Sequence, residues 1–179
     1  MKADRDRMTH EVLRQIPYGL YILGVRGRGN RAMNALAASW VTQCSFEPPL
    51  LMVAVRKPSR TYDLVKTGQV FSLNLLDKKA RRIIRTLERP FRAVGDKLGK
   101  VSHVEEDTGA PILRQAFAYL ECKVRAIYEP GDHALIVGEV VHAGLRGQGK
   151  PITCAESADD RKAASASARD PRSRTGVTA

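Results

Sequence analysis

The residues between 56 and 61 combine charges and hydroxyl groups at the end of an apolar run. Arg56 and Lys57 follow the run 50–55, and Ser59 and Thr61 come shortly after them. Ser59 is a suitable N-cap, so a helix is expected to begin there. The free N–H groups of a helix N-terminus, together with cations and hydroxyls, can bind a phosphate group. Capping and solubility are the alternative explanation for the same residue types.

A second group of residues, upstream of the first, could bind a flat ring. The stretch AASW places Ala37 and Ala38 before Ser39 and Trp40. Small side chains let a planar ligand approach the backbone, and the Ser39 hydroxyl can donate and accept hydrogen bonds. Trp40 could stack on a ring, and core packing is its alternative role. A ligand that is planar at one end and phosphorylated at the other, such as FMN, would use both groups of residues.

The elements that must position these groups are mainly β-strands. Apolar or alternating patterns predict strands over 18–25, 49–56, 69–76, 118–128 and 133–145. The last two are joined by a turn at Pro130-Gly131. Short helices are predicted over 59–66 and 78–88, the second with Asp77 as its N-cap. Because no regular alternation of strands and helices appears, a closed or partly closed antiparallel barrel is expected.

The strand over 118–128 has a period of two. Its alternate positions are apolar, while Glu121, Lys123 and Arg125 fall between them. This pattern predicts a half-buried strand with the charged side chains on its other face. Cys122 lies at an apolar position and is expected to act as a small buried hydrophobic residue.

Charge and cysteine content limit the function classes. The net charge is +11, and part of the excess lies on the predicted helix over 78–88. A solvated basic face explains it, and an anionic partner is the alternative. Nucleic-acid binding is not favoured, because no aromatic RNA-binding motif, zinc finger or helix-turn-helix accompanies the charge. Three widely spaced cysteines and four histidines show no ligand spacing, so neither a metal site nor a disulfide framework is predicted.

Location and domain organisation follow from the same composition. No apolar run is long enough to cross a bilayer, and residues 1–15 form a charged, helical lead-in without the apolar core of a secretory signal. A cytoplasmic protein without membrane contact is therefore expected. Residues 1–155 are predicted to form one domain, and residues 156–179, which are rich in Ala, Ser and Arg, a disordered or aberrant tail.

Three motifs in order resemble those of a known family. NALAASWVTQCSFEPPLLMVAVRKPSRTYDLV closely resembles the signature of the flavin reductase-like, FMN-binding split-barrel family. GDKLGKV and GDHALIVGEV are similar to its middle and last motifs. The resemblance covers roughly residues 16–152, and Ala35-Leu36-Ala37 departs from the usual Gly-Met-Thr. It implies a mainly β fold, an FMN-binding split β-barrel of Greek-key type with short helices.

The resemblance also implies roles for individual residues. The ring of FMN would be contacted by Asn34, Ala37, Ala38, Ser39 and Trp40, and its ribityl chain by Cys44, Ser45 and Phe46. The phosphate would be held by Arg56, Ser59 and Thr61. Lys97 would lie near the flavin and stabilise negative charge on its reduced ring. His133 would position the nicotinamide of NAD(P)H, since hydride transfer needs an ordered stack and little acid–base chemistry.

The function implied by the resemblance is an FMN-binding oxidoreductase. It would be an NAD(P)H-dependent flavin reductase or a flavoredoxin-like electron carrier, as a homodimer with a monooxygenase or redox-protein partner. The alternative is a split barrel that binds flavin without turnover, or a basic one that binds nucleic acid. NADH and NADPH are not distinguished, because Arg26, Arg28 and Arg31 could contact a 2′-phosphate or be merely solvated.

Overall fold

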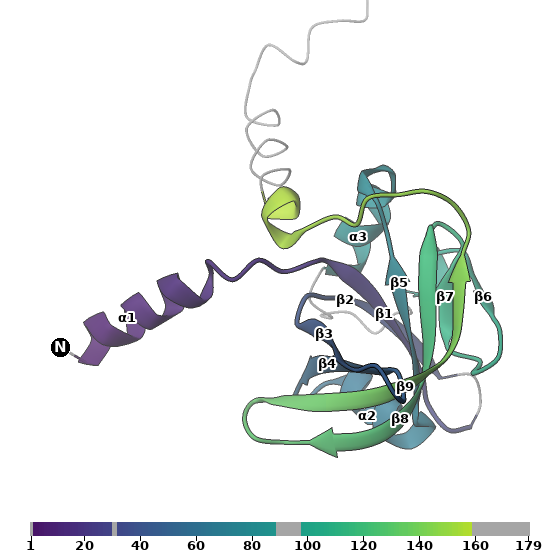
Figure 1. Ribbon diagram of the computed structural model, residues 1–179, viewed down its shortest axis with the longest axis horizontal. Helices are drawn as coiled ribbons and strands as arrows, with labels where there is room; N and C mark the ends of the chain where they lie inside the picture. The colour runs from purple at the N-terminus through teal and green to yellow at the C-terminus, as the bar shows by residue number, and fades with distance from the viewer. Residues whose placement is uncertain (1, 30–31, 89–97, 159–179) are drawn as a thin grey trace, which may run out of the picture. The chain divides into compact units, whose positions relative to one another are not determined.

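The computed structural model describes residues 2–29, 32–88 and 98–158 (Figure 1). The chain divides into two compact units: residues 19–152 form one, and residues 1–18 with 153–179 form the other. The unit 19–152 contains all the strands of the main sheet. Most of the tail predicted over 156–179 lies outside the described residues, so the tail stays a prediction.

Seven antiparallel strands form the main sheet of the unit 19–152. They are β1 (Tyr21–Arg26), β2 (Met33–Ala38), β3 (Val41–Ser45), β4 (Leu50–Arg56), β5 (Val70–Leu75), β8 (Ala118–Tyr128) and β9 (His133–Leu145). Their order in the sheet is β2-β1-β5-β8-β9-β4-β3. The sheet curls until β2 approaches β4 (Figure 1). The predicted mainly β, barrel-like fold is confirmed.

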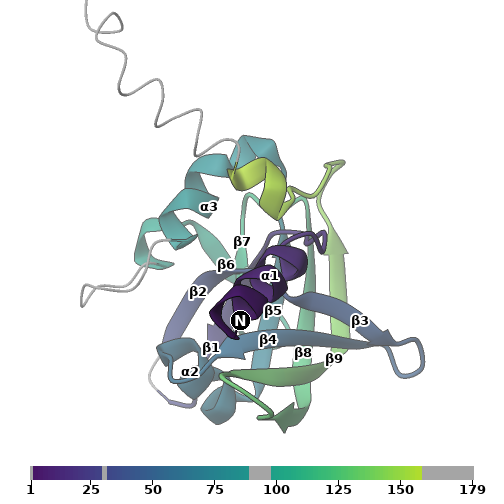
Figure 2. The ribbon, with the colours of Figure 1, turned by 90° about the vertical axis from the view of Figure 1, so that its left-hand side faces the viewer.

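The connections between these strands are of Greek-key type. β5, β8 and β9 are successive strands of the main sheet and lie side by side, and β4, which precedes β5 in the chain, lies beside β9. Figure 2 shows β3 and β4 as a hairpin on this side of the sheet. Two short strands, β6 (His103–Glu105) and β7 (Pro111–Leu113), form a separate hairpin that the sequence analysis missed. Strands of three residues are too short to show a period.

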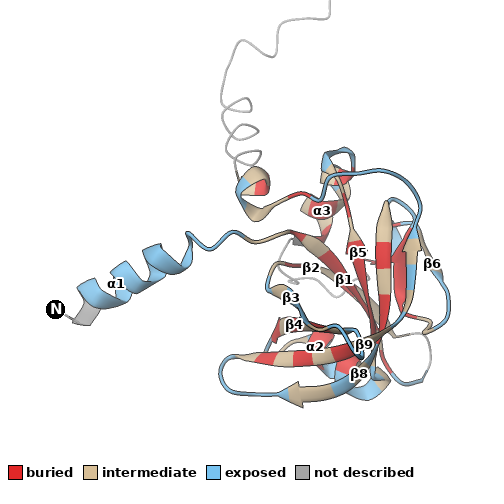
Figure 3. Cartoon of the chain, viewed as in Figure 1, coloured by how far each residue is buried: buried red, intermediate tan, exposed pale blue. Residues whose placement is uncertain are grey.

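The core lies inside the curl of the sheet (Figure 3). Its buried apolar residues come from the strands and one helix, and include Leu23, Val25, Val53, Val55, Val65, Phe71, Leu73 and Ile136. Cys122 is fully buried among them, as predicted. Burial raises the pKa of the Cys122 thiol to about 12, and the neighbouring Glu121 charge adds to the shift.

Two short helical segments follow β4 and β5. Helix α2 (Arg60–Gly68) begins at the predicted N-cap, because the Ser59 hydroxyl accepts a hydrogen bond from the Tyr62 N–H at 3.2 Å. The second segment begins at Asp77 with a 3₁₀ turn, η1 (Lys78–Ala80), and continues as α3 (Arg81–Glu88). Ile84 and Leu87, three positions apart on α3, are buried. A further 3₁₀ turn, η2 (Leu98–Lys100), precedes β6.

A buried asparagine fastens the β6–β7 hairpin to the main sheet. Asn74 of β5 is fully buried, accepts the N–H of Leu113 at 2.7 Å and donates to the carbonyl of Ile22 at 3.1 Å. Its neighbour Ser72 donates to the Pro111 carbonyl at 2.5 Å. Two polar side chains of β5 therefore satisfy backbone groups of β1 and β7 that would otherwise be buried without a partner.

Glu121 departs from the pattern predicted for β8, because it is completely buried. The loop between β6 and β7 covers this part of the outer face of the sheet. The Glu121 carboxylate accepts the N–H groups of Asp107 and Thr108 at 3.2 and 2.9 Å, and the Thr108 hydroxyl at 2.5 Å. Lys123 and Arg125, further along the same face, are exposed as expected. The period identified the face of the strand correctly, and the prediction was wrong about what covers it.

A polar cluster surrounds Glu121. His142, its partner on β9, places Nδ1 3.3 Å from the Glu121 carboxylate. The Oε1 atom of Glu106 lies 2.6 Å from Arg146, and the Tyr119 hydroxyl donates to the other oxygen. Glu106, Glu121 and His142 offer ligand atoms within 4.8 Å of one another. Arginine, hydroxyl and backbone donors already bond to the carboxylates of Glu106 and Glu121, so we interpret the cluster as a set of structural contacts. The absence of a metal site stays a prediction.

The other unit contains the two ends of the chain. Helix α1 (Lys2–Leu13) confirms the helical lead-in, and its described side chains are exposed. Residues 154–158 form a helical turn with a capping box: the Glu156 carboxylate accepts the Thr153 N–H at 3.0 Å, and the Thr153 hydroxyl accepts the Glu156 N–H at 3.3 Å. Within the described residues, every helix is too short or too polar to cross a membrane.

Replacing Asn74 with alanine is expected to destabilise the fold. The change leaves the Leu113 N–H buried without an acceptor, and each such group costs about 1–3 kcal/mol of unfolding free energy. Urea unfolding followed by circular dichroism measures the loss. Gln115→Ala on the exposed loop after β7 is the control, with an expected change within about 0.5 kcal/mol. Equal stability of the two variants would contradict the role of Asn74.

The Glu106 cluster predicts an acid-dependent stability. The hydrogen bond from Tyr119, followed by that from Arg146, lowers the pKa of Glu106 below its ordinary value of 4.5. A carboxyl with a lowered folded-state pKa stabilises the protein above its unfolded-state pKa, and that contribution is lost as pH falls through the folded-state pKa.

The melting temperature of Tyr119→Phe should consequently fall less steeply than that of the wild type between about pH 5 and pH 3. Circular dichroism at stepped pH measures both slopes. Tyr128→Phe, at an exposed tyrosine of the same strand, should keep the wild-type slope. Parallel curves for Tyr119→Phe and wild type would rule the explanation out.

Candidate functional site

Three residues predicted to contact the ligand meet at one place in the fold. Arg56 ends β4 directly opposite His133, the first residue of β9. Trp40 lies between β2 and β3, and its carbonyl accepts the N–H of Ala54 of β4 at 2.9 Å. The rings of Trp40 and His133 have centroids 4.7 Å apart and are tilted by 51°. The Arg56 cation and the ring pair of Trp40 and His133 therefore lie together at the end of β4.

The surface of Trp40 is accessible. Its side chain is 47% exposed, so core packing, the alternative role considered from the sequence, does not describe it. A half-exposed indole beside an imidazole gives a planar apolar surface on which a ring can stack. Arg56, the ladder partner of His133, is exposed as well.

The helix start predicted to hold phosphate follows Arg56 directly. Ser59 caps α2 through its hydroxyl oxygen, and its carbonyl accepts the N–H of Asp63 at 3.1 Å. Thr61 is buried, and its hydroxyl accepts a hydrogen bond from the Asn34 side chain at 2.9 Å. Asn34 lies on β2, so this bond joins the predicted ring-binding strand to the predicted phosphate-binding helix. The sequence predicts both residues at the site but carries no signal that they contact each other.

The small residues predicted beside the ring lie at the end of β2. Ala37 and Ala38 pair with Ile22 and Tyr21 of β1. The carbonyl of Ser39 accepts the N–H of Val41 at 3.0 Å. This tight turn leads the chain from β2 into β3 and places Trp40 at the turn.

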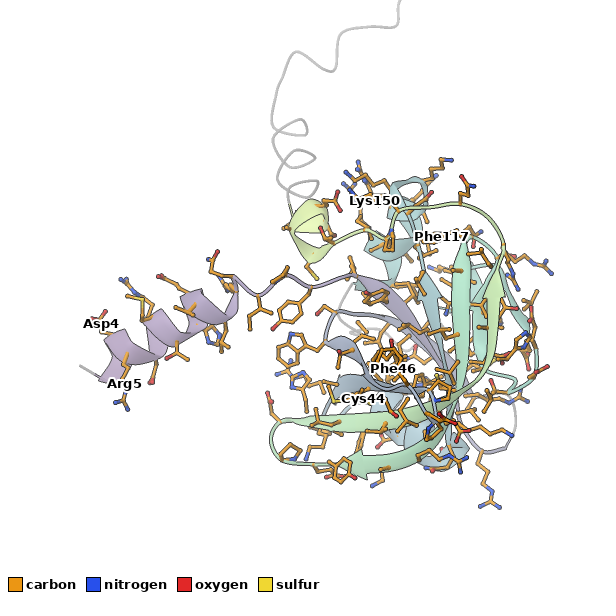
Figure 4. All side chains as sticks on the ribbon, in the orientation of Figure 1. Asp4, Arg5, Cys44, Phe46, Phe117 and Lys150 are labelled. Carbon is orange, nitrogen blue, oxygen red and sulfur yellow. The ribbon has the colours of Figure 1, made fainter. Side chains whose placement is uncertain are left out.

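The residues predicted along the ribityl chain lie on and after β3. Cys44 and Phe46 are exposed, Phe46 to 88%, and Figure 4 shows both side chains. Ser45 pairs with Leu50 of β4, and the register shifts between Gln43 and Ser45, which leaves Cys44 in a bulge. The pairing of β3 with β4 connects this segment to the strand that carries Arg56. Lys97 lies outside the described residues, so its role near the flavin stays a prediction.

Asp132 is a residue of this site that the sequence analysis did not select. Its carboxylate accepts a hydrogen bond from His133 Nδ1 at 2.8 Å, an assignment that follows from the carboxylate being an acceptor. The bond lowers the pKa of Asp132. The Asp132 carbonyl also accepts the N–H of Lys57 at 2.8 Å. Its place beside His133 in the Gly-Asp-His motif was the available signal.

The arginines considered for a 2′-phosphate lie at a separate cavity of about 430 Å³. Arg26 and Arg28 line it, together with Thr67 and Gln69 at the end of α2. Arg26 pairs with Glu105 and donates to the Gly109 carbonyl at 3.2 Å. Arg31 lies outside the described residues. Glu105 thus neutralises the charge of Arg26, whereas the exposed Arg28 still offers a cation to this cavity.

The arrangement suits binding and orientation more than covalent catalysis. Arg56 provides positive charge, α2 provides backbone N–H groups, and Trp40 and His133 provide a stacking surface. In the described contacts of the site, His133 bonds to a carboxylate, and no hydroxyl or thiol is activated by it. A planar ligand with an anionic end fits these groups.

Comparisons with known proteins identify the family of this chain. The sequence profile described as "Flavin reductase like domain" matches residues 13–160. Diflavin flavoprotein A 1 of Synechocystis sp. is 33% identical over 138 residues, which are 76% of this chain and 24% of that protein. The reductase subunit Stc3 of stachydrine N-demethylase from Rhizobium meliloti is 30% identical over 154 residues, 83% of this chain and 65% of that protein.

A solved structure supports the fold. The NADH:FAD oxidoreductase of Streptomyces globisporus C-1027 matches with a TM-score of 0.75 and 26% identity, over 83% of this chain and 88% of that one. The chain spans only 17–24% of the length of the diflavin flavoproteins that it matches. Because the profile covers most of the sequence and the strands follow the same fold, the chain belongs to the flavin reductase-like domain family.

Proposed function

We propose that this site binds FMN and that the protein reduces it with NAD(P)H. One observation carries the proposal: Trp40, Arg56 and His133 converge on the end of β4, directly before the capped start of α2. A stacking surface and a cationic helix start are thus placed on one short stretch of backbone. Membership of the flavin reductase-like family supports flavin as the ligand.

The residues present fit the two ends of FMN. Arg56 is exposed at the point where the backbone N–H groups of α2 begin, which suits the phosphate. Trp40 offers a half-exposed ring, and Ala37, which is partly exposed, has a side chain small enough for a flat group to approach. Ala38, also predicted at the ring, is buried in the hydrophobic core. Asn34 and Thr61 hold the two sides of the site together through their hydrogen bond.

The protein groups would bind and orient the reactants. Bound FMN would supply the two-electron acceptor for the hydride of NAD(P)H. His133, held by Asp132 and packed beside Trp40, would position the nicotinamide. Alignment and exclusion of water are the main requirements of hydride transfer, so a positioning histidine is sufficient.

A partner and a second copy of the chain are part of the proposal. The relative Stc3 is named as a reductase subunit, which supports a monooxygenase or other redox protein as the acceptor of electrons. The exposed side chains of Trp40 and Phe46 support a homodimer, because apolar groups at a ligand site are commonly covered by another subunit.

The visible absorption spectrum tests the proposed function. Purified protein is mixed with FMN or FAD, desalted and scanned, and is then assayed with excess flavin and either NADH or NADPH. Retained FMN that is bleached by one nicotinamide supports the proposal, and turnover with free flavin distinguishes a reductase from an electron carrier. Retained flavin without reduction by either nicotinamide would indicate the non-enzymatic alternative.

Arg56→Gln is expected to weaken FMN binding. A charge-assisted hydrogen bond contributes about 1.5–3 kcal/mol, so the Kd should rise by roughly 10-fold to 100-fold. Quenching of flavin fluorescence measures it. Arg114→Gln, at an exposed arginine of the loop after β7, is the matched control and should leave the Kd unchanged. A wild-type Kd for Arg56→Gln would remove the phosphate role.

His133→Asn is expected to act on the nicotinamide. The KM for NAD(P)H should rise by about 10-fold, which corresponds to about 1.4 kcal/mol, while the Kd for FMN changes less than about twofold. Steady-state kinetics at saturating FMN, together with a flavin titration, separate the two effects. His10→Asn on the exposed helix α1 should match the wild type. A loss confined to FMN binding would place His133 at the flavin instead.

A further inference from the structure

Glu129, at the tip of the β8–β9 hairpin, contacts two residues that flank the phosphate end of the site. One of its carboxylate oxygens accepts a hydrogen bond from the Tyr62 hydroxyl. The other lies 3.1 Å from the ammonium group of Lys57. Lys57 comes just before the cap of α2, and Tyr62 lies in the first turn of that helix. The Glu129 side chain therefore contacts residues on both sides of the helix start.

The Tyr62 contact is anchored in the core. Tyr62 is buried and belongs to the central hydrophobic cluster. Its backbone N–H donates to the Ser59 hydroxyl, and the ammonium group of Lys66 lies 5.0 Å from its ring centre. Glu129 therefore bonds to a tyrosine whose ring is held by the core and whose backbone is held by the cap of α2. The bond raises the pKa of Tyr62, and together with Lys57 it lowers that of Glu129.

Lys57 is held by two contacts with the β8–β9 hairpin. The Lys57 N–H donates to the carbonyl of Asp132 at 2.8 Å, while its ammonium group pairs with Glu129. Asp132 in turn holds His133. The hairpin tip and the β4–α2 junction are thus joined at three points beyond the last ladder pair, that of Arg56 with His133.

An exposed ion pair alone would contribute little, because the Glu129 side chain is 45% exposed and solvent screens such pairs. The hydrogen bond from Tyr62 differs, because the ring that carries its hydroxyl is packed in the hydrophobic core and is held in place. The Tyr62–Glu129 bond is therefore the contact that fixes the junction.

We propose that Glu129 is a positioning residue that holds the β4–α2 junction, residues 56–61, in the geometry that binds the flavin phosphate, and that keeps His133 aligned with it. This inference rests on the proposed function. Glu129 itself would contact neither ligand. It acts by linking the segment that binds the phosphate to the hairpin that carries the nicotinamide-positioning histidine.

The test uses Tyr62→Phe, Glu129→Ala and the double variant of the full chain. Each single change should raise the Kd for FMN by about 10-fold, and the double variant should be no weaker than the weaker single one, because both changes remove the same bond. At saturating FMN, kcat should stay within about twofold of wild type, since the reacting groups remain.

Glu129→Gln provides the conservative comparison. Its amide oxygen still accepts the Tyr62 hydroxyl but loses the charge that pairs with Lys57, so its Kd should lie between those of wild type and Glu129→Ala. Glu105→Ala is the matched control. Glu105 lies on the short strand β6, is partly exposed like Glu129, and pairs with Arg26 of β1. It should leave the Kd unchanged.

The outcomes separate the two proposals. If the wild type binds FMN and the Glu129 and Tyr62 variants bind it equally well, the positioning role is rejected and the proposed function stands. If the single effects add in the double variant, or if the melting temperature falls with kcat and Kd together, the bond is merely structural and the role is also rejected. If the wild-type protein itself retains no flavin and oxidises no NAD(P)H, both proposals fail.

Discussion

The pairing of β4 with β9 is the constraint on which the site depends. The ladder runs without interruption from Leu50–Glu139 to Arg56–His133. It brings a cation and an imidazole from distant parts of the sequence to the same end of the sheet. The same strand receives the Trp40 carbonyl at Ala54 and leads directly into α2. A shift of the β4–β9 register by one residue would place Arg56 and His133 on opposite faces of the sheet and separate them.

Local signals were sufficient for much of the fold. The strands predicted over 118–128 and 133–145 coincide with β8 and β9, because period-two patterns and a Pro-Gly turn are contained within the segments themselves. The caps at Ser59 and Asp77 also lie where the sequence indicated, since capping depends on one side chain and its own helix.

What the sequence did not reveal depends on contacts between distant segments. Glu121 was expected on an open face, and the β6–β7 loop, more than ten residues away, covers it. The bond between Asn34 and Thr61 joins two elements whose proximity follows from the curl of the sheet. Glu129 and the Asp132 carbonyl lie in a turn, and the approach of the β4–α2 junction gives them partners on Lys57 and Tyr62. No periodicity encodes such pairings.

The short strand β3 has a consequence for how the protein avoids aggregation. Among the described strands, β3 pairs with β4 alone, so its other edge presents backbone groups to which a foreign strand could add. It is five residues long, and the bulge at Cys44 interrupts its regular hydrogen-bonding pattern. Bulged, short edges are poor templates for fibril growth. The short, bulged edge of β3 therefore discourages indiscriminate stacking of strands.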